Sequence, residues 1–167
     1  MFRVSRRLDY GLQLMSALAA VSEGQLQPTA ALAERLEMPL PFLHQIAHVL
    51  MQSGLIRATP GQKGGLKLSQ PAENITVRQI AEALEGPITL SPCQDCEADC
   101  PRRDSCATFM IWNELQEKIV QHLDSINLGM LCNNRDRIPG FTIPARNPTI
   151  LLPKSNRDYK AANTSTL

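Results

Sequence analysis

The sequence predicts a mainly α-helical protein with a winged helix-turn-helix, a small β-hairpin wing and a long C-terminal helix. Three observations predict this fold class. Residues 28–54 read as two helices separated by a tight turn, a hairpin signal follows directly, and apolar residues recur at helical spacing from Phe109 to Ile126. A chain of 167 residues, 43% of them hydrophobic, is long enough to bury a core.

The first helix is expected over residues 5–21, and the next two helices form the helix-turn-helix. Apolar side chains of the first helix recur at Tyr10, Leu14, Leu18 and Val21. Pro28 suits the first turn of the second helix, and Pro39 and Pro41 prevent that helix from continuing. Pro41 then opens a third helix, for which Gly54 supplies a left-handed C-terminal cap.

The third helix has one apolar face and one polar face. The apolar face consists of Phe42, Ile46, Val49 and Leu50, and the polar face of His44, Gln45, His48 and Gln52. Polar side chains of this kind donate to and accept from base edges in the major groove of DNA, which admits an α-helix. On an isolated helix such a face more often meets only water, so the neighbouring segments decide between the two interpretations.

A basic β-hairpin is expected directly after the third helix, in LIRATPGQKGGLKLSQP. Residues 55–58 are strand-like, PGQKGG is a tight turn, and Leu66 and Leu68 alternate as the returning strand. A hairpin alone is an ordinary surface turn, but a basic hairpin immediately after a helix-turn-helix favours a DNA-binding wing. The expected phosphate contacts are Arg57, Lys63 and Lys67 of the hairpin and Arg6 and Arg7 of the first helix.

Two further helices are expected after the hairpin. The segment NITVRQIAEALEGP begins with a capping box formed by Thr76 and Gln79, and Gly86 with Pro87 ends it. The apolar stripe of the long helix is Phe109, Trp112, Leu115, Ile119, Leu123 and Ile126. Such a stripe needs a partner surface, either a second copy of the same helix or the rest of its own domain. DNA readers of the helix-turn-helix type commonly bind as two-fold dimers, which favours a homodimer.

Between these two helices lies SPCQDCEADCPRRDSC, with Cys93, Cys96, Cys100 and Cys106 in fourteen positions. No run approaches eighteen apolar residues and the N-terminus lacks the apolar stretch of a secretory signal, so we expect a cytoplasmic protein with reduced thiols and no membrane partner. The residues alone leave an iron–sulfur cluster, a zinc site and incidental thiols open. Cys132, beyond the long helix, is expected to be incidental.

Charge is distributed unevenly along the chain, although the net charge is +1. Residues 1–70 hold seven basic and four acidic residues, residues 71–134 hold four and ten, and residues 135–167 hold six and two. Both ends therefore suit a polyanion better than the middle does. No loop of the Walker or Rossmann type is present and no histidine lies beside a nucleophile in sequence, so an enzyme is not expected.

These motifs resemble the IscR/NsrR group of the Rrf family, bacterial winged-helix transcription regulators that include regulators of iron–sulfur assembly operons. The matching stretches are SRRLDYGLQLM, PLPFLHQIAHVLMQSGLI, GQKGGLKLSQPAENITVRQIAEALEGPI and the cysteine segment followed by WNEL. The resemblance covers residues 1–131. The LDYGL opening and the passage from LEGPI to the cysteines resemble the subgroup that regulates SUF-type cluster assembly.

The resemblance implies a homodimer on double-stranded DNA with an iron–sulfur cluster, 2Fe–2S or 4Fe–4S, held by Cys93, Cys100 and Cys106. Relatives differ in the fourth ligand: a histidine of some members falls at Phe109 here, whereas Asp9 occupies the position of the aspartate that the partner subunit supplies in others. Cys96 competes with Asp9 for this role. Relatives often carry an arginine before the wing glycine, where this chain has Pro60.

The implied organisation has four parts: a DNA-binding domain with its linker helix over residues 1–86, a cluster-binding loop over 87–106, a dimerisation helix over 107–131 and a flexible tail over 132–167. The implied function is a regulator that senses cluster status through iron, oxidation or nitric oxide, and that controls cluster assembly or related stress genes. Two alternatives remain: a metal-free thiol-sensing repressor of the same fold, and a zinc-stapled interaction module without a DNA role.

Overall fold

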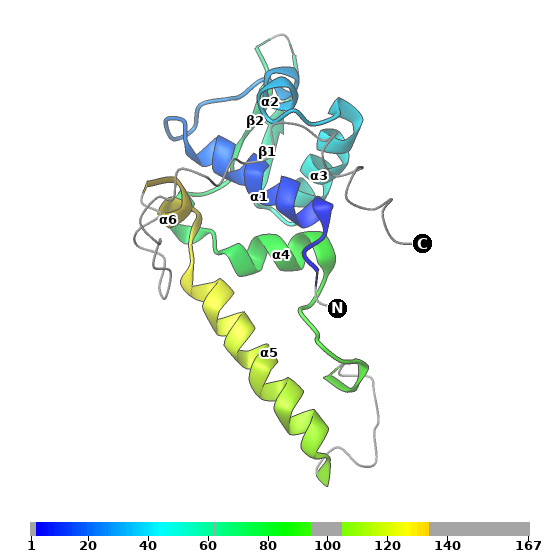
Figure 1. Ribbon diagram of the computed structural model, residues 1–167. Coiled ribbons are helices and arrows are strands. Elements are labelled where there is room, and N and C mark those ends of the chain that lie inside the picture. Colours follow the sequence, from blue (N-terminus) through cyan, green and yellow to red (C-terminus); the bar gives the residue numbers. More distant parts are fainter. Residues whose placement is uncertain (1–2, 62, 95–104, 134–167) are drawn as a thin grey trace, which may run out of the picture.

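A computed structural model describes residues 3–61, 63–94 and 105–133 of the chain. Within these residues it contains six α-helices, two 3-10 helices and one two-stranded sheet (Figure 1). In chain order the elements are α1 (Arg6–Ala19), α2 (Thr29–Arg35), α3 (Leu40–Gln52), β1 (Ile56–Thr59), β2 (Gly65–Leu68), η1 (Ala72–Asn74), α4 (Val77–Glu85), η2 (Pro92–Gln94), α5 (Ala107–Ser125) and α6 (Leu128–Asn133). None of the described helices is long and apolar enough to cross a membrane.

The core lies between α1, α3 and α4 and is closed by the hairpin and α6. Its fully enclosed side chains come from every one of these elements: Leu14, Met15, Leu43, Ile46, Leu50, Ile56, Ile80 and Leu128 are 0–2% exposed. Helices α1 and α4 approach closely because α1 has a glycine at the crossing. A Cβ at Gly11 would overlap the side chain of Leu84, so no larger residue fits there without a shift.

The helix-turn-helix forms as the sequence predicts. Pro28 precedes the first residue of α2, Pro39 precedes α3, and Gly54 takes a left-handed φ of +72° just after α3. The turn between the two helices contains Glu37 with a φ of +50°, a conformation that usually selects glycine. The Met38 N–H donates to the carbonyl of Ala33 across this turn, so the strained residue is held by a backbone bond.

The wing is an antiparallel pair in which Ile56 faces Leu68 and Thr59 faces Gly65. Its strands lie within one residue of the expected bounds. Gln27, just before α2, adds a bridge to Leu66 with two backbone hydrogen bonds of 2.8 and 2.9 Å. A Cβ at residue 65 would overlap the Gln27 carbonyl, which explains the glycine there.

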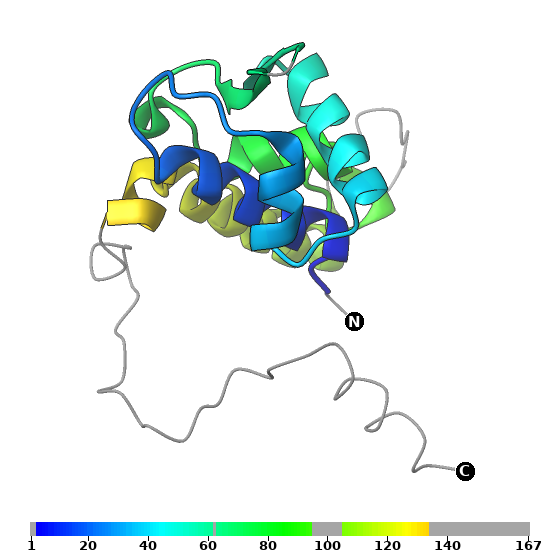
Figure 2. The same ribbon diagram turned by 90° about the horizontal axis from the view of Figure 1, so that it is seen from above.

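Helix α5 lies outside the core and projects from the domain on the α4 side (Figure 1). Seen from above, it lies beneath α1 and α4, while α6 lies beside the end of α1 (Figure 2). The expected single stripe from Phe109 to Ile126 is wrong at its end, because α5 stops at Ser125. Ile126 is extended and buried, and its carbonyl accepts from the Val77 N–H at 2.9 Å.

Candidate functional site

The polar face of α3 is exposed to solvent. His44, Gln45, His48 and Gln52 are all exposed, whereas Leu43, Ile46, Ala47 and Leu50 of the same helix are buried. The two faces therefore separate as the spacing predicts, although Leu43 was missed as a core residue. Four neighbouring side chains that donate and accept, on the exposed face of a helix in a winged helix-turn-helix, have the chemistry that major-groove recognition needs.

Exposed basic residues lie in two elements that contact this helix, α1 and the wing. Arg6 and Arg7 are exposed in the first turn of α1, and Tyr10 of that helix packs edge-on against Phe42 at the start of α3, with ring centroids 5.6 Å apart. Lys63 is exposed in the turn of the wing, which follows the end of α3. The fold thus presents cations from two segments, the first turn of α1 and the wing, and phosphate contacts of this kind fix a protein on DNA.

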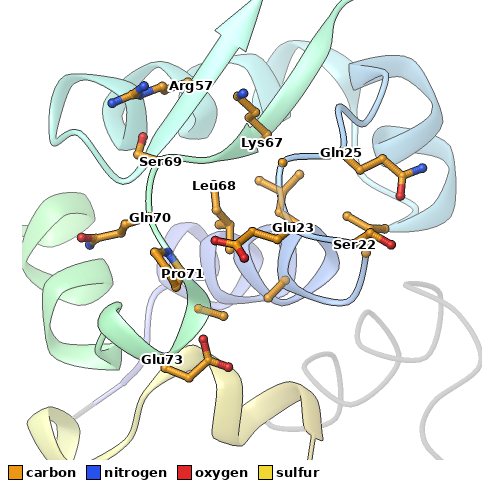
Figure 3. A pocket seen from close by; sticks show the side chains of 15 residues that line it. Ser22, Glu23, Gln25, Arg57, Lys67, Leu68, Ser69, Gln70, Pro71 and Glu73 are labelled. Carbon is orange, nitrogen blue, oxygen red and sulfur yellow. The ribbon is translucent and has the colours of Figure 1, made fainter.

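Arg57 and Lys67 lie lower on the wing and face each other across the two strands. They line a pocket of about 370 Å³ together with two carboxylates, Glu23 from the segment after α1 and Glu73 from η1 (Figure 3). None of the five predicted phosphate contacts, these two included, forms an ion pair with another described residue. The nearby carboxylates make this pocket less attractive to phosphate than the turn around Lys63.

The structure describes two of the predicted cluster ligands. Cys93 is exposed within η2, and Cys106 is half-buried at the N-cap of α5. Both are free thiols, and both lie at α5, since η2 packs against that helix. Cys96 and Cys100 lie outside the described residues. Within the described ranges no three His, Cys, Asp or Glu side chains gather as a metal site.

The helix end at Cys106 is suited to an anionic ligand. The side chain of the N-cap residue Cys106 makes no capping hydrogen bond, and the first turn of α5 contains no acidic residue. The first N–H groups of a helix carry partial positive charge, which stabilises negative charge placed there. A thiolate at Cys106, with or without a bound metal, would lie at this end.

Sequence reasoning missed a glutamine that organises the turn around Cys93. Gln94 is only 9% exposed, and its Oε1 accepts from the N–H of Leu90 at 3.0 Å and of Ser91 at 2.9 Å. Gln116 of α5 accepts from the same Leu90 N–H at 3.1 Å. Nothing in the periodicity marks Gln94, although its place beside Cys93 was available as a signal.

Asp9, the candidate ligand from a partner subunit, is exposed in the first turn of α1 and accepts from Gln13 at 3.0 Å. The start of α1 is joined to the end of α4 by a hydrogen bond of 2.8 Å from Ser5 to Glu85. Asp9 therefore lies on the side of the domain where the chain leaves α4 for the cysteine segment.

Cys132 lies apart from the other cysteines, in α6. Its thiol donates to the carbonyl of Ser16 at 3.4 Å, and burial, with a smaller effect of Glu73, raises the pKa of the thiol above its usual value. A protonated thiol packed on α1 is a poor ligand and a poor nucleophile.

Comparisons with known proteins identify the family of this chain. The profile of the Rrf2 family, described as iron-dependent transcriptional regulator, matches residues 4–134. The HTH-type transcriptional regulator IscR of Klebsiella pneumoniae (strain 342) is 30% identical over 134 residues, 80% of this chain and 82% of the relative, and IscR of Escherichia coli K12 is 29% identical over the same coverage.

Solved structures show the same fold. CymR, the global cysteine regulator of B. subtilis, superposes with a TM-score of 0.65 at 26% identity, over 79% of this chain and 97% of the other. IscR of T. potens superposes with a TM-score of 0.65 at 25% identity, over 85% of this chain and 94% of the other. CymR of Staphylococcus aureus superposes with a TM-score of 0.60 at 32% identity, over 79% of this chain and 99% of the other. The resemblance to the SUF subgroup stays a prediction. The chain belongs to the Rrf2 family of transcriptional regulators, DNA-binding proteins with a winged helix.

Proposed function

We propose that this regulator is a homodimer whose DNA affinity depends on an iron–sulfur cluster held by Cys93, Cys100 and Cys106. The observation that carries the proposal is the place of Cys93 and Cys106. Both free thiols lie where the DNA-reading domain ends and α5 begins. A ligand bound there contacts the joint between the part that reads DNA and the helix available for pairing.

The donor chemistry fits a cluster. Thiolates are the preferred ligands of iron–sulfur clusters, and an exposed Cys93 with a half-buried Cys106 at a helix N-terminus leaves one side open for assembly. Cys100 is the third ligand that the family resemblance implies. For the fourth position Asp9 of the partner subunit and Cys96 both remain candidates, and the nuclearity, 2Fe–2S or 4Fe–4S, remains open with them.

The dimer is supported by the apolar surface of α5. No residue of this helix is buried, and Met110, Ile111 and Leu115 are 66%, 63% and 38% exposed. A helix with an uncovered apolar face is stabilised by packing on a second copy, which also gives the two-fold symmetry of paired DNA half-sites.

The proposed DNA contacts divide between base edges and phosphates. His44, Gln45 and His48 contact base edges, and Lys63 with Arg6 and Arg7 anchors the domain on phosphates. Cys93, Cys100 and Cys106 would hold the cluster, which would supply sensitivity to iron and to oxidation at these thiolates. With both thiolates engaged, the turn at Cys93 and the start of α5 at Cys106 would be held together, and this would limit how the two DNA-reading domains of the dimer are placed.

The test is a DNA titration of oxygen-free protein with its cluster, and of the same protein after removal of iron. The proposal expects different affinities, or different salt slopes, for the two forms on a selected duplex. Identical affinities and slopes would rule out control by a cluster. The proposed target genes are those for cluster assembly or related stress. The sequence of the DNA duplex that the protein selects would locate them.

A metal-free thiol sensor is the second candidate, because CymR superposes well and an oxidised form of Staphylococcus aureus CymR also matches, at 30% identity and a TM-score of 0.61. Visible absorption of iron-replete, oxygen-free protein separates the two. Membership of the Rrf2 family favours both over a zinc-stapled module without a DNA role.

A further inference from the structure

The turn that carries Cys93 is fastened to α5 by two glutamines. The Leu90 N–H is shared between Oε1 of Gln94, at 3.0 Å, and Oε1 of Gln116, at 3.1 Å. Oε1 of Gln94 also accepts from the Ser91 N–H at 2.9 Å, and the Gln94 N–H donates to the Ser91 carbonyl at 3.0 Å. One backbone donor therefore links the cysteine turn to the middle of α5.

Gln94 is the one polar residue counted as buried within the described part of the chain. Its Nε2 has no hydrogen-bond partner there, and burying an unpaired donor costs free energy. The hydrogen bonds that Oε1 accepts must offset this cost. An apolar residue at this position would avoid that cost but would leave the N–H groups of Leu90 and Ser91 without an acceptor. The arrangement holds the shape of the turn, and the residue next to it is Cys93.

Helix α5 has a second attachment at its other end. Asp124 accepts from Thr76 at 3.3 Å and from Arg78 at 3.4 Å, and the Val77 N–H donates to the Ile126 carbonyl at 2.9 Å. Between the two attachments lies a groove of about 420 Å³ whose lining includes Arg78, Gln94, Gln116 and Gln121. No residue of α5 between Ala107 and Gln116 is buried, and the cysteine turn packs against this helix.

We propose that Gln94 and Gln116 are positioning residues that hold Cys93 in ligand geometry and transmit the state of that thiolate to the angle between α5 and the DNA-reading domain. This inference rests on the proposed function. Loss of the ligand at Cys93 frees a turn that two glutamines otherwise fix to α5. Partners that orient a metal ligand typically contribute 10- to 100-fold to retention of the metal.

The experiment compares two removals with two conservative changes. Gln94→Ala and Gln116→Leu delete an acceptor, whereas Gln94→Glu and Gln116→Glu keep an oxygen in its place. Gln121→Leu is the matched control, because Gln121 is exposed on the same helix and lines the same groove without a hydrogen bond to the turn among the described residues. Circular dichroism with thermal unfolding first confirms that each variant folds, and Gln116→Leu serves if Gln94→Ala does not.

Three measurements are made on oxygen-free, full-length protein. They are the rate of cluster loss to an iron chelator, hydrogen exchange of the Leu90 and Ser91 amides, and the ratio of DNA affinities with and without cluster. We expect about 10-fold weaker cluster retention in the two removal variants, with faster exchange at Leu90 and a DNA ratio that falls towards one. Gln116→Glu should restore retention, and Gln121→Leu should match the wild type.

The outcomes separate the inference from the function on which it rests. Removal variants that keep the cluster as firmly as the wild type, with the same DNA ratio, overturn the inference and leave the cluster sensor standing. Faster exchange without weaker retention also overturns it, because the glutamines would then shape only the turn. Wild-type protein that takes up no iron overturns the proposed function itself.

Discussion

The winged-helix domain and α5 differ in how many of their side chains are buried. The domain encloses seventeen residues in one apolar cluster, with Leu14, Leu43, Ile46 and Leu50 wholly removed from solvent. Helix α5 is the longest described helix, and it buries none of its nineteen residues. The first region has a closed core within one chain, whereas the second leaves apolar side chains such as Met110 and Ile111 exposed.

The two regions differ in how freely they can change shape. A fully packed domain transmits strain but changes shape little, since its interior is close-packed. A helix tied at one end to α4 and in its middle to the cysteine turn has an orientation that depends on those ties. The described cysteines Cys93 and Cys106 lie in the region whose packing is incomplete.

The largest expected effect comes from the winged-helix domain. Leu43→Ala removes a side chain that is 0% exposed and should lower the free energy of unfolding by about 2–5 kcal/mol. Leu40→Ala, on the same helix at 40% exposure, should cost less than about 1 kcal/mol. Urea unfolding at one fixed protein concentration measures both, because dimer stability depends on concentration. Equal losses would contradict the assignment of the core.

The second prediction concerns α5. Leu115→Glu places a charge on the apolar face of α5 and should weaken the dimer by about 2 kcal/mol, which is roughly 30-fold in Kd. Gln121→Glu adds the same charge at an exposed position of the same helix and should leave the dimer intact. Sedimentation equilibrium reports the dimer and far-ultraviolet circular dichroism the fold. A Leu115→Glu variant that stays dimeric would exclude this face from the interface.

Substitutions on the DNA-binding surface of the winged-helix domain should change DNA affinity without changing cluster content. His48→Ala is expected to cost about 1–3 kcal/mol on a selected duplex and to relax sequence preference. Lys63→Ala is expected to weaken binding to all duplexes alike and to lower the salt slope by about 1. Fluorescence anisotropy at several salt concentrations measures both. A change of sequence preference in Lys63→Ala would contradict its role as a phosphate contact.

The smallest effect is expected at the joint between the two regions. Thr76 caps α4 by accepting from the Gln79 N–H at 3.2 Å, and its hydroxyl donates to Asp124 of α5. Thr76→Ala should therefore cost about 1 kcal/mol of unfolding free energy, measured by urea titration. Thr76→Ser keeps the hydroxyl and should restore most of this loss. If serine restored nothing, the methyl group rather than the cap would be the stabilising part.

Local signals explain what the sequence predicted well. The capping box of Thr76 and Gln79, the left-handed Gly54 and the prolines that frame α3 act within a few residues of each other, so each is legible without the fold. The exposed polar face of α3 follows from helical spacing alone. Residues 134–167, expected to be a flexible tail, lie outside the described residues, and that expectation stays a prediction.

Features set by distant contacts were not predicted. Ile126 continues the apolar spacing of α5, yet it leaves the helix because its backbone pairs with Val77 and because Leu128 enters the core. Gln94 is polar and would ordinarily be exposed. It is buried because two backbone donors and α5 surround it. The spacing of residues in the sequence does not indicate these contacts.

Native mass spectrometry of oxygen-free protein tests the central claim most directly, because it reports subunits, iron and sulfide in one spectrum. The account predicts a dimer that carries one iron–sulfur cluster for each chain and that loses it in Cys93→Ala and Cys106→Ala but keeps it in Cys132→Ala. A colourless, iron-free dimer from iron-replete cells would contradict the claim.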